Sequence, residues 1–333
     1  MTQVAGPPVE PSIVPSGPVS PRSTLVPRIV AAVVVAVLLA APLFLAPFAT
    51  STLTRVVVFA LLAVSLDLLV GVTGLPSLGH AAYFGVGAYA AGLTAIHVTP
   101  EIPVPLLVGA AVAALAAALT GWVAVRAHGV FFLMLTLAIG EILVQVAQSW
   151  ESVTGGFNGL FGIPTAQLAG ISLFNVGLTY WYALAVALLG FTIVWLVARS
   201  PFGAALRGIR DNEPRMRALG YPSALYKYGV FVLAGSVAGM AGAVFAQQGT
   251  RLVTPEDLGF TTSALMLLAV IIGGAGSLWG AALGAALVIV VRDALGPALD
   301  GHGELLLGLV FVAVVYLLPQ GAAGLTRLHR RRP

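Results

Sequence analysis

A series of apolar runs, nearly free of charged side chains, extends through this sequence from residue 29 to residue 319. Only 8% of the 333 residues are charged and 59% are hydrophobic, whereas a soluble domain carries about 25% charged residues. A helix that crosses a bilayer needs about 20 mainly apolar residues. The composition therefore excludes an ordinary soluble domain and predicts an all-α, polytopic transmembrane helical bundle.

Ten apolar segments follow one another along the chain. They span residues 29–49, 55–73, 79–98, 104–125, 129–149, 178–198, 228–248, 261–274, 279–292 and 304–319. The eighth and ninth segments are short for full crossings, and the glycines at 273, 274 and 276 separate them. They are interpreted either as two short crossings or as a re-entrant hairpin. We therefore expect about 8–10 spans with one glycine-broken segment.

Basic residues indicate how the chain is oriented, because cytoplasmic loops are enriched in Lys and Arg. With both termini in the cytoplasm, all but three of the 16 basic residues fall on the inner side. The exceptions at the outer ends are Arg55, Arg251 and Arg292. The net charge of +4 is thus explained by membrane topology without a nucleic-acid partner. We expect a multi-pass protein of the plasma (inner) membrane.

The chain divides into three parts. Residues 1–28 are rich in proline and are expected to form a disordered cytoplasmic tail; a signal peptide is the alternative, although the apolar run that follows is long for one. Residues 29–320 form the transmembrane domain, and residues 321–333 form a basic cytoplasmic tail.

Two loops of the transmembrane domain stand out. The longest outer loop, 150–177, has no Lys or Arg, and the longest inner loop, 199–227, has six basic residues. The apolar residues Phe157, Phe161 and Ile163 favour packed structure in the outer loop over a disordered tether.

Residue counts exclude several kinds of chemistry. Cysteine is absent and the five histidines are scattered, so the sequence offers no thiolate metal site, disulfide or cysteine nucleophile. The only lysine, Lys227, follows Tyr226, whereas a phosphate-binding loop needs Gly-Lys. We therefore expect no enzymatic activity and no cofactor in this chain.

Polar residues inside the apolar segments are candidates for a solute path. Asp67 and Glu141 fall within predicted spans, where a carboxylate costs about 2.5–3.5 kcal/mol on insertion scales. Each is expected to face the bundle interior or an aqueous path; a structural pair or a protonated acid that holds helices together is the alternative. His80 near an inner helix start is either a path residue or an interfacial histidine. Gln145 either extends the polar stripe of Glu141 or bonds a neighbouring helix.

The inner loop has a helical pattern. Ala205, Leu206 and Ile209 are spaced to share one face of a short helix, with Arg210 and Asp211 on other faces. An amphipathic helix of this kind lies on a membrane surface or docks into a cytosolic partner. A simple positive-inside anchor is the alternative.

At this loop the sequence resembles the coupling segment of branched-chain amino-acid ABC transporter permeases of the LivM type. The similar residues are Arg207-Gly208-Ile209-Arg210-Asp211-Asn212-Glu213 and Ala218-Leu219-Gly220. Residues 67–71, 77–89, 136–142, 154–156 and 273–280 are also similar to the family's motifs, so the resemblance covers roughly residues 30–320. The family often has Asn where Asp67 stands. Pro214-Arg215 replaces the usual small-residue pair, which suggests a partner ATPase with its own matching surface.

The resemblance implies a permease subunit of an ATP-driven importer. Its implied partners are a second permease, which is either a paralogue or another copy of this chain, two cytosolic ABC ATPases that bind the ATP, and an extracytoplasmic substrate-binding protein. The implied ATPase-coupling residues are Arg207, Gly208, Arg210, Asp211, Asn212, Glu213, Ala218 and Gly220. The implied path residues are Asp67, Ser77, His80, Glu141, Gln145, Gly273, Gly274, Gly276 and Ser277. The implied docking residues for the binding protein are Gly155, Gly156 and Asn158.

The expected solute is a branched-chain amino acid or a similar small polar molecule. Urea and short amides are alternatives within the same class of importer. A channel, or a proton-coupled secondary transporter that uses Asp67 and Glu141, is the alternative from a different class. Dependence on a partner ATPase separates these interpretations.

Overall fold

The computed structural model describes residues 25–248 and 252–295, together with positions 305, 308, 309, 312 and 316. Residues 1–41 and 42–333 form two compact units, and α1 (Leu25–Phe44) begins in the first of them. Most of the proline-rich tail predicted at 1–28, the basic tail at 321–333 and most of the tenth apolar segment lie outside the described residues. The description that follows concerns the second unit.

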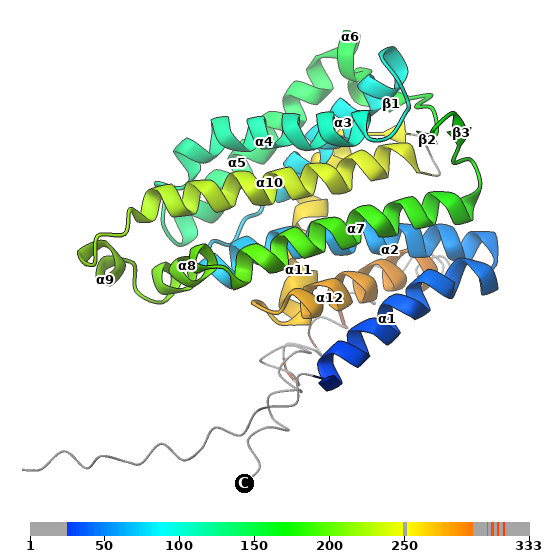
Figure 1. Cartoon of the computed structure of the whole chain (residues 1–333). Coiled ribbons are helices and arrows are strands. Elements are labelled where there is room, and N and C mark those ends of the chain that lie inside the picture. The colour runs from blue at the N-terminus through cyan, green and yellow to red at the C-terminus, as the bar shows by residue number, and fades with distance from the viewer. Residues whose placement is uncertain are drawn as a thin grey trace, which may run out of the picture. The chain divides into compact units, whose positions relative to one another are not determined.

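Helices make up most of the described part of the second unit (Figure 1). The longer helices are α2 (Pro47–Asp67), which continues as the π-helical η1 (Leu68–Thr73), α3 (His80–His97), α4 (Val104–Ala124), α5 (Val130–Ser149), α7 (Val176–Arg199) and α10 (Ser223–Gln247). Among the described residues, five helical stretches are long and apolar enough to cross a membrane: Pro47–Thr73, Val104–Ala124, Val130–Ser149, Val176–Arg199 and Ser223–Gln247. The predicted all-α polytopic bundle is confirmed.

The glycine-rich break is present where the sequence predicts it. α11 (Phe260–Gly273) and α12 (Leu278–Val290) are separate helices of 14 and 13 residues, and α12 continues as the π-helical η4 (Val291–Leu295). Between them, Gly274 and Gly276 have φ angles of 97° and 85°, which residues with a Cβ rarely adopt. The turn therefore depends on glycine, and both helices are shorter than the about 20 residues of a full crossing.

Small residues bring the central helices together. A Cβ on Gly239 of α10 would lie 2.3 Å from the Ala113 side chain of α4, and one on Gly242 would lie 1.9 Å from the Phe84 carbonyl oxygen of α3. Such close approach is typical of helix packing in membranes. The glycines of α10 therefore allow α3, α4 and α10 to pack closely.

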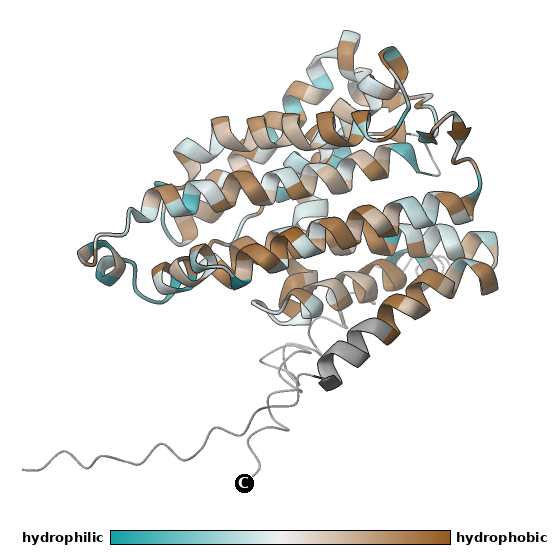
Figure 2. Ribbon diagram, viewed as in Figure 1, coloured by the Kyte–Doolittle hydropathy of each residue, from teal (hydrophilic) through white to brown (hydrophobic). Residues whose placement is uncertain are grey.

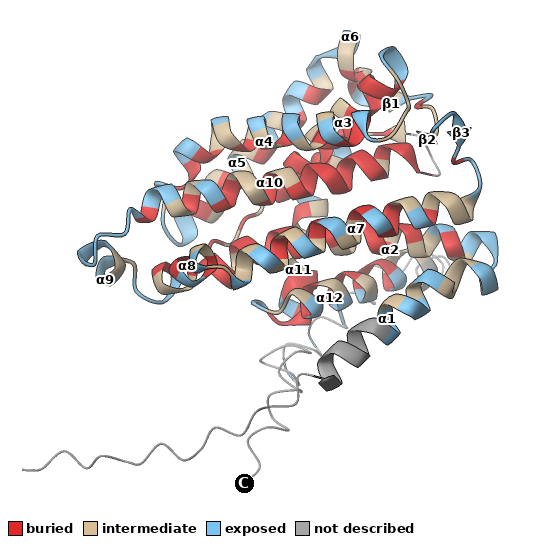
Figure 3. Cartoon of the chain, in the orientation of Figure 1, coloured by how far each residue is buried: buried red, intermediate tan, exposed pale blue. Residues whose placement is uncertain are grey.

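Burial and hydropathy separate the bundle into zones. Buried residues gather along α2, α3 and α10, whereas α4, α5 and α7 expose much of their surface (Figure 3). The exposed faces carry large apolar side chains such as Leu107 and Leu119. Hydrophobic residues occupy much of the length of the long helices (Figure 2). These faces suit contact with lipid tails or with another membrane subunit.

The outer loop forms a small packed cap at one end of the bundle. It contains α6 (Glu151–Thr154), the 3₁₀-helix η2 (Gly156–Asn158), β1 (Leu160–Phe161), β2 (Gln167–Leu168) and β3 (Ile171–Ser172). β1 pairs antiparallel with β4 (Leu252–Val253), and β2 pairs antiparallel with β3; the 3₁₀-helix η3 (Pro255–Leu258) follows β4. Ile163 is fully buried, whereas Phe157 and Phe161 are exposed. The predicted packed structure is thus confirmed, but the two phenylalanines are not part of its core.

Candidate functional site

The predicted coupling loop folds into two short helices at the end of the bundle opposite the β1–β4 pair (Figure 1). α8 (Pro201–Asp211) starts after Ser200, whose side chain accepts a backbone hydrogen bond and caps the helix. α9 (Glu213–Ala218) starts after Asn212, which caps it in the same way. Proline follows soon after each cap, where its fixed φ angle and missing N–H suit the first helical turn.

α8 has the amphipathic character that its sequence predicts. Ala205, Leu206 and Ile209 are buried against the bundle, whereas Arg210 and Asp211 are exposed. Beyond α9, the chain exposes the apolar side chains of Leu219 and Tyr221. The segment thus combines an inner face that belongs to the bundle with an outer face of mixed charged and apolar residues.

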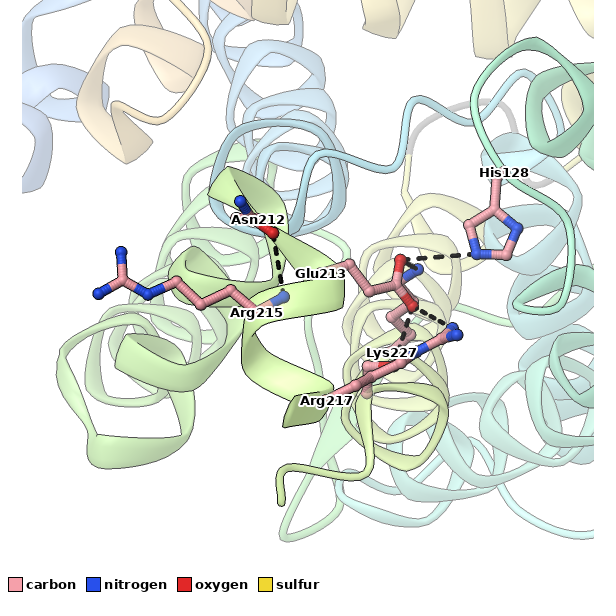
Figure 4. A network of polar contacts seen from close by, with 7 residues as sticks. His128, Asn212, Glu213, Arg215, Arg217 and Lys227 are labelled. Carbon is pink, nitrogen blue, oxygen red and sulfur yellow. Dashed lines mark hydrogen bonds and ion pairs between the residues drawn. The ribbon is translucent and has the colours of Figure 1, made fainter. Parts of the chain in front are cut away.

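Glu213 is the centre of a polar network between three parts of the chain (Figure 4). Its Oε2 accepts a hydrogen bond from Lys227 Nζ at 2.5 Å and lies 3.5 Å from His128 Nε2. Its Oε1 accepts hydrogen bonds from Arg217 Nη2 at 2.6 Å and Ser223 Oγ at 2.9 Å. The side chain is only 16% exposed, so the carboxylate ties α9 to α10 and to the α4–α5 loop.

This network sets the charge state of Glu213. Burial acts to raise the pKa of the carboxyl group, but the interactions with Lys227, Ser223 and Arg217 outweigh burial and lower the pKa from 4.5 to about 2. A group whose pKa is lowered by folding stabilises the fold above its unfolded pKa, and this stabilisation is lost as the pH falls through the folded pKa.

We therefore expect a defined pH window for Glu213. The unfolding temperatures of the native chain and of Glu213→Gln should differ by a constant amount above about pH 5, and the difference should shrink as the pH falls from about 4.5 towards 2. Thermal unfolding of both proteins in detergent from about pH 6 to about pH 3 measures it. An unchanged difference across this range would contradict the assignment.

A second set of contacts joins α8 to the membrane-embedded break. Arg210 Nη1 donates a hydrogen bond to the carbonyl oxygen of Gly71 in η1. Gly71 packs so closely on the α11–α12 turn that a Cβ on it would lie 2.0 Å from Gly276 N. Gly276 N in turn donates a hydrogen bond to Asp67 Oδ1 at 2.7 Å. The coupling helix, the end of α2–η1 and the glycine turn therefore form one continuous contact.

Asp67 and His80 lie in the interior of the chain, where the sequence predicts them. Both are buried, and His80 Nε2 lies 2.9 Å from Ser65 Oγ. Ser77 is also buried, and Ser277 caps α12 by accepting a hydrogen bond from a backbone N–H. Asp67 Oδ2 and His80 Nδ1 have no hydrogen-bond partner among the described residues.

Glu141 and Gln145 lie elsewhere. Both are exposed on the outward face of α5, and Gln145 Nε2 donates to Ser149 Oγ at 3.3 Å. The expectation that Glu141 faces the interior of this chain's bundle is therefore wrong. A position along a span fixes the depth of a residue, but the face depends on how the helix is rotated by its packing. The predicted polar stripe is present, because Glu141 and Gln145 lie one turn apart on the same exposed face of α5.

The residues predicted to dock a binding protein lie at the opposite end, in the packed cap. Gly155 and Gly156 have φ angles of 77° and 62° and form a tight turn before Asn158, which is exposed. The neighbouring Phe157 and Phe161 expose 75% and 71% of their surface. Exposed aromatic residues are enriched at protein interfaces, so they extend this surface. Their position between closely spaced glycines of a loop, outside the predicted spans, is the signal that could have identified them from the sequence.

A comparison with known proteins decides the family. Residues 48–315 match the family described as the permease component of the branched-chain amino acid transport system. The chain belongs to this family. The permease is 29% identical over 298 residues to the high-affinity branched-chain amino acid transport system permease protein LivM of Salmonella typhimurium, with 82% of this chain and 69% of the relative covered. LivM of Escherichia coli K12 is 28% identical over the same shares of the two chains.

A more distant relative is named for a different solute. The autoinducer 2 import system permease protein LsrC of Escherichia coli O9:H4 is 30% identical to the permease over 189 residues, which is 54% of each chain. No solved structure matches the permease significantly. The comparisons establish a permease subunit of an ABC importer, a multi-pass protein of the inner membrane that is not itself an enzyme. The predicted family is thus confirmed.

Proposed function

We propose that this permease carries branched-chain amino acids or similar small polar solutes into the cytoplasm, driven by two separate ATPases. The observation that carries the proposal is the amphipathic α8, which is buried on one side and exposed on the other in a chain similar to LivM over 82% of its length. An extracytoplasmic binding protein delivers the solute to the packed cap. A second permease subunit covers the outward face of α5 that carries Glu141 and Gln145. Both termini of the chain lie in the cytoplasm.

The eight predicted coupling residues have three different tasks in this proposal. Asp211, Ala218 and Gly220 are exposed and belong to the surface that the ATPase contacts. Arg210 and Glu213 bond to other parts of the chain and pass movement of α8–α9 into the bundle. Arg207 belongs with them, because its Nη1 donates to the Ala198 carbonyl oxygen at 2.6 Å. Gly208 and Asn212 keep the helices short and close together: a Cβ on Gly208 would lie 2.8 Å from Met216 Sδ.

We expect the exposed surface of α9 and its C-terminal extension to hold the ATPase. Arg215→Glu reverses a charge on this surface, and Leu219→Glu places a charge on an apolar contact. Each variant should reduce the amount of ATPase that copurifies with the permease by about tenfold. Leu168→Glu makes the same change at an exposed leucine of the opposite end and should have no effect. Equal copurification with all three variants would contradict the assignment of this surface.

Transport itself is tested by reconstitution. Liposomes that contain the permease, its partner permease and the two ATPases should take up labelled leucine only when the binding protein and ATP are present. Competition by valine, isoleucine, urea and a short amide identifies the class of solute. Uptake that follows a proton gradient without ATP would support the proton-coupled alternative and overturn the importer mechanism. Efficient competition by urea but not by amino acids would overturn the proposed solute.

A further inference from the structure

A cavity of about 480 Å³ lies at the capped end of the bundle, between the ends of α2, α7 and α10 and the η4 turn. Its volume falls within the roughly 300–1,000 Å³ of small-molecule sites. Thr165 of the outer loop lines it, so it lies on the side where a binding protein would deliver solute. The path residues predicted from the sequence are absent from its lining.

Opposite charges meet in this cavity. Arg55 Nη1 lies 3.1 Å from Asp293 Oδ2, and both side chains line the cavity. The two residues are not equally fixed, because Asp293 Oδ1 also accepts a hydrogen bond from Arg292 Nε at 2.8 Å. The Asp293 side chain is only 13% exposed, whereas that of Arg55 is 41% exposed. Arg55 can therefore swing away while Arg292 keeps the carboxylate in place.

Two buried amides face the same cavity. Gln247 and Gln248, at the end of α10, are 2% and 6% exposed and line it. Tyr182 OH donates a hydrogen bond to Gln247 Oε1 at 3.2 Å, but Gln247 Nε2 and Gln248 Oε1 have no partner among the described residues. A buried polar group without a partner costs about 1–3 kcal/mol. Such groups in a cavity therefore point to a ligand or water that completes their hydrogen bonds.

The lining also offers apolar surface. Phe48 and Val176 lie on it together with several hydroxyl-bearing residues. A ligand that satisfies the whole lining has one anionic group, one cationic group and an apolar part. A zwitterionic α-amino acid has this composition, whereas urea and short amides are uncharged.

We propose that this cavity binds an α-amino acid, with the ligand's carboxylate on Arg55, its ammonium group on Asp293 and its side chain beside Phe48 and Val176. This site deepens the proposed function and rests on it. On entry, the Arg55–Asp293 pair is exchanged for two pairs with the ligand, so that no charge is left unpaired in the cavity. Gln247 and Gln248 add a donor and an acceptor to the bound ligand. An uncharged solute would have to break the pair without replacing it, and this selects against urea and amides.

The site is tested on the complete transporter in lipid nanodiscs without the binding protein. Four compounds are compared as competitors of labelled leucine: unlabelled leucine, 4-methylpentanoate, which lacks only the ammonium group, isopentylamine, which lacks only the carboxylate, and urea. 4-Methylpentanoate and isopentylamine should compete at least about tenfold more weakly than leucine, because each loses one charge-assisted interaction. Urea should not compete. This comparison needs no variant, so it does not depend on how a variant folds.

Variants then locate the binding. Arg55→Gln and Asp293→Asn should each weaken leucine binding by about tenfold or more, and Arg55→Lys should retain more binding than Arg55→Gln. Arg126→Gln at the opposite end and Glu256→Gln, an exposed acid near the cap, are matched controls that should bind leucine as the native protein does. Unchanged leucine binding in both R55Q and D293N, or competition by urea as strong as by leucine, would overturn the site.

ATP-driven uptake by the same complexes separates this site from the proposed function. If the native complex takes up leucine and R55Q and D293N do so with the same concentration dependence, the site is wrong and the importer stands. If the native complex takes up no amino acid, the proposed solute fails and the site fails with it.

Discussion

Replacement of Gly71 by alanine should destabilise the permease and abolish ATP-coupled uptake. The added Cβ would lie 2.0 Å from Gly276 N and 2.4 Å from Asp67 Oδ1. The first of these is backbone in a turn that depends on glycine, so it cannot move aside as a flexible side chain would. Overpacking of this kind costs about 1–3 kcal/mol, and it would also push apart the contact between α8, η1 and the α11–α12 turn.

Thermal unfolding in detergent and uptake into liposomes measure the two effects of Gly71→Ala. Gly229→Ala is the matched control, because Gly229 is exposed on α10 and a Cβ there would only touch Phe202 at an ordinary 3.5 Å. G229A should unfold at or slightly above the native temperature, since alanine favours a helix more than glycine does. If G71A behaves like G229A in both measurements, the contact has no role in stability or coupling.

Replacement of Glu213 by glutamine should be the most damaging single change in the coupling segment. Lys227 has a side chain only 5% exposed and would lose its closest anionic partner. Removal of one partner from a buried ion pair leaves an uncompensated charge, which here should cost about 2–3 kcal/mol. His128, Arg217 and Ser223 would also lose the carboxylate that holds them together, so α9 should loosen and coupled uptake should fall.

A double variant separates this charge effect from a general loss of structure. Glu213→Gln combined with Lys227→Met removes both charges and should recover much of the unfolding temperature lost in E213Q. Asp211→Asn is the control, because Asp211 is 69% exposed and, among the residues that the structure describes, pairs only with the neighbouring Arg210; a surface pair contributes about 0–1 kcal/mol. If E213Q is no less stable than D211N, or if the double variant is less stable than E213Q, the network does not fix α9.

The sequence predicted the shape of the coupling segment better than it predicted the partners of the charged residues. The spacing of Ala205, Leu206 and Ile209 predicted the amphipathic α8 correctly. The same pattern gave no sign that Glu213 turns into the chain, because its contacts with Lys227 and His128 depend on how α9 meets α10 and the α4–α5 loop. Arg55 and Arg292 were only exceptions to the positive-inside pattern, and the fold gives them partners.

The sequence by itself determined the helices of this protein and the family to which it belongs. In a bilayer each backbone group must be bonded within its own helix, so every crossing requires a long apolar run that can be read directly. The tertiary structure decided which polar residues act together. Helix rotation, set by close contacts between small residues, buries Asp67 and exposes Glu141. It also brings together Arg55 and Asp293, 238 positions apart, and Asp67 and Gly276, 209 positions apart, because such pairs depend on packing between distant helices and leave no local pattern.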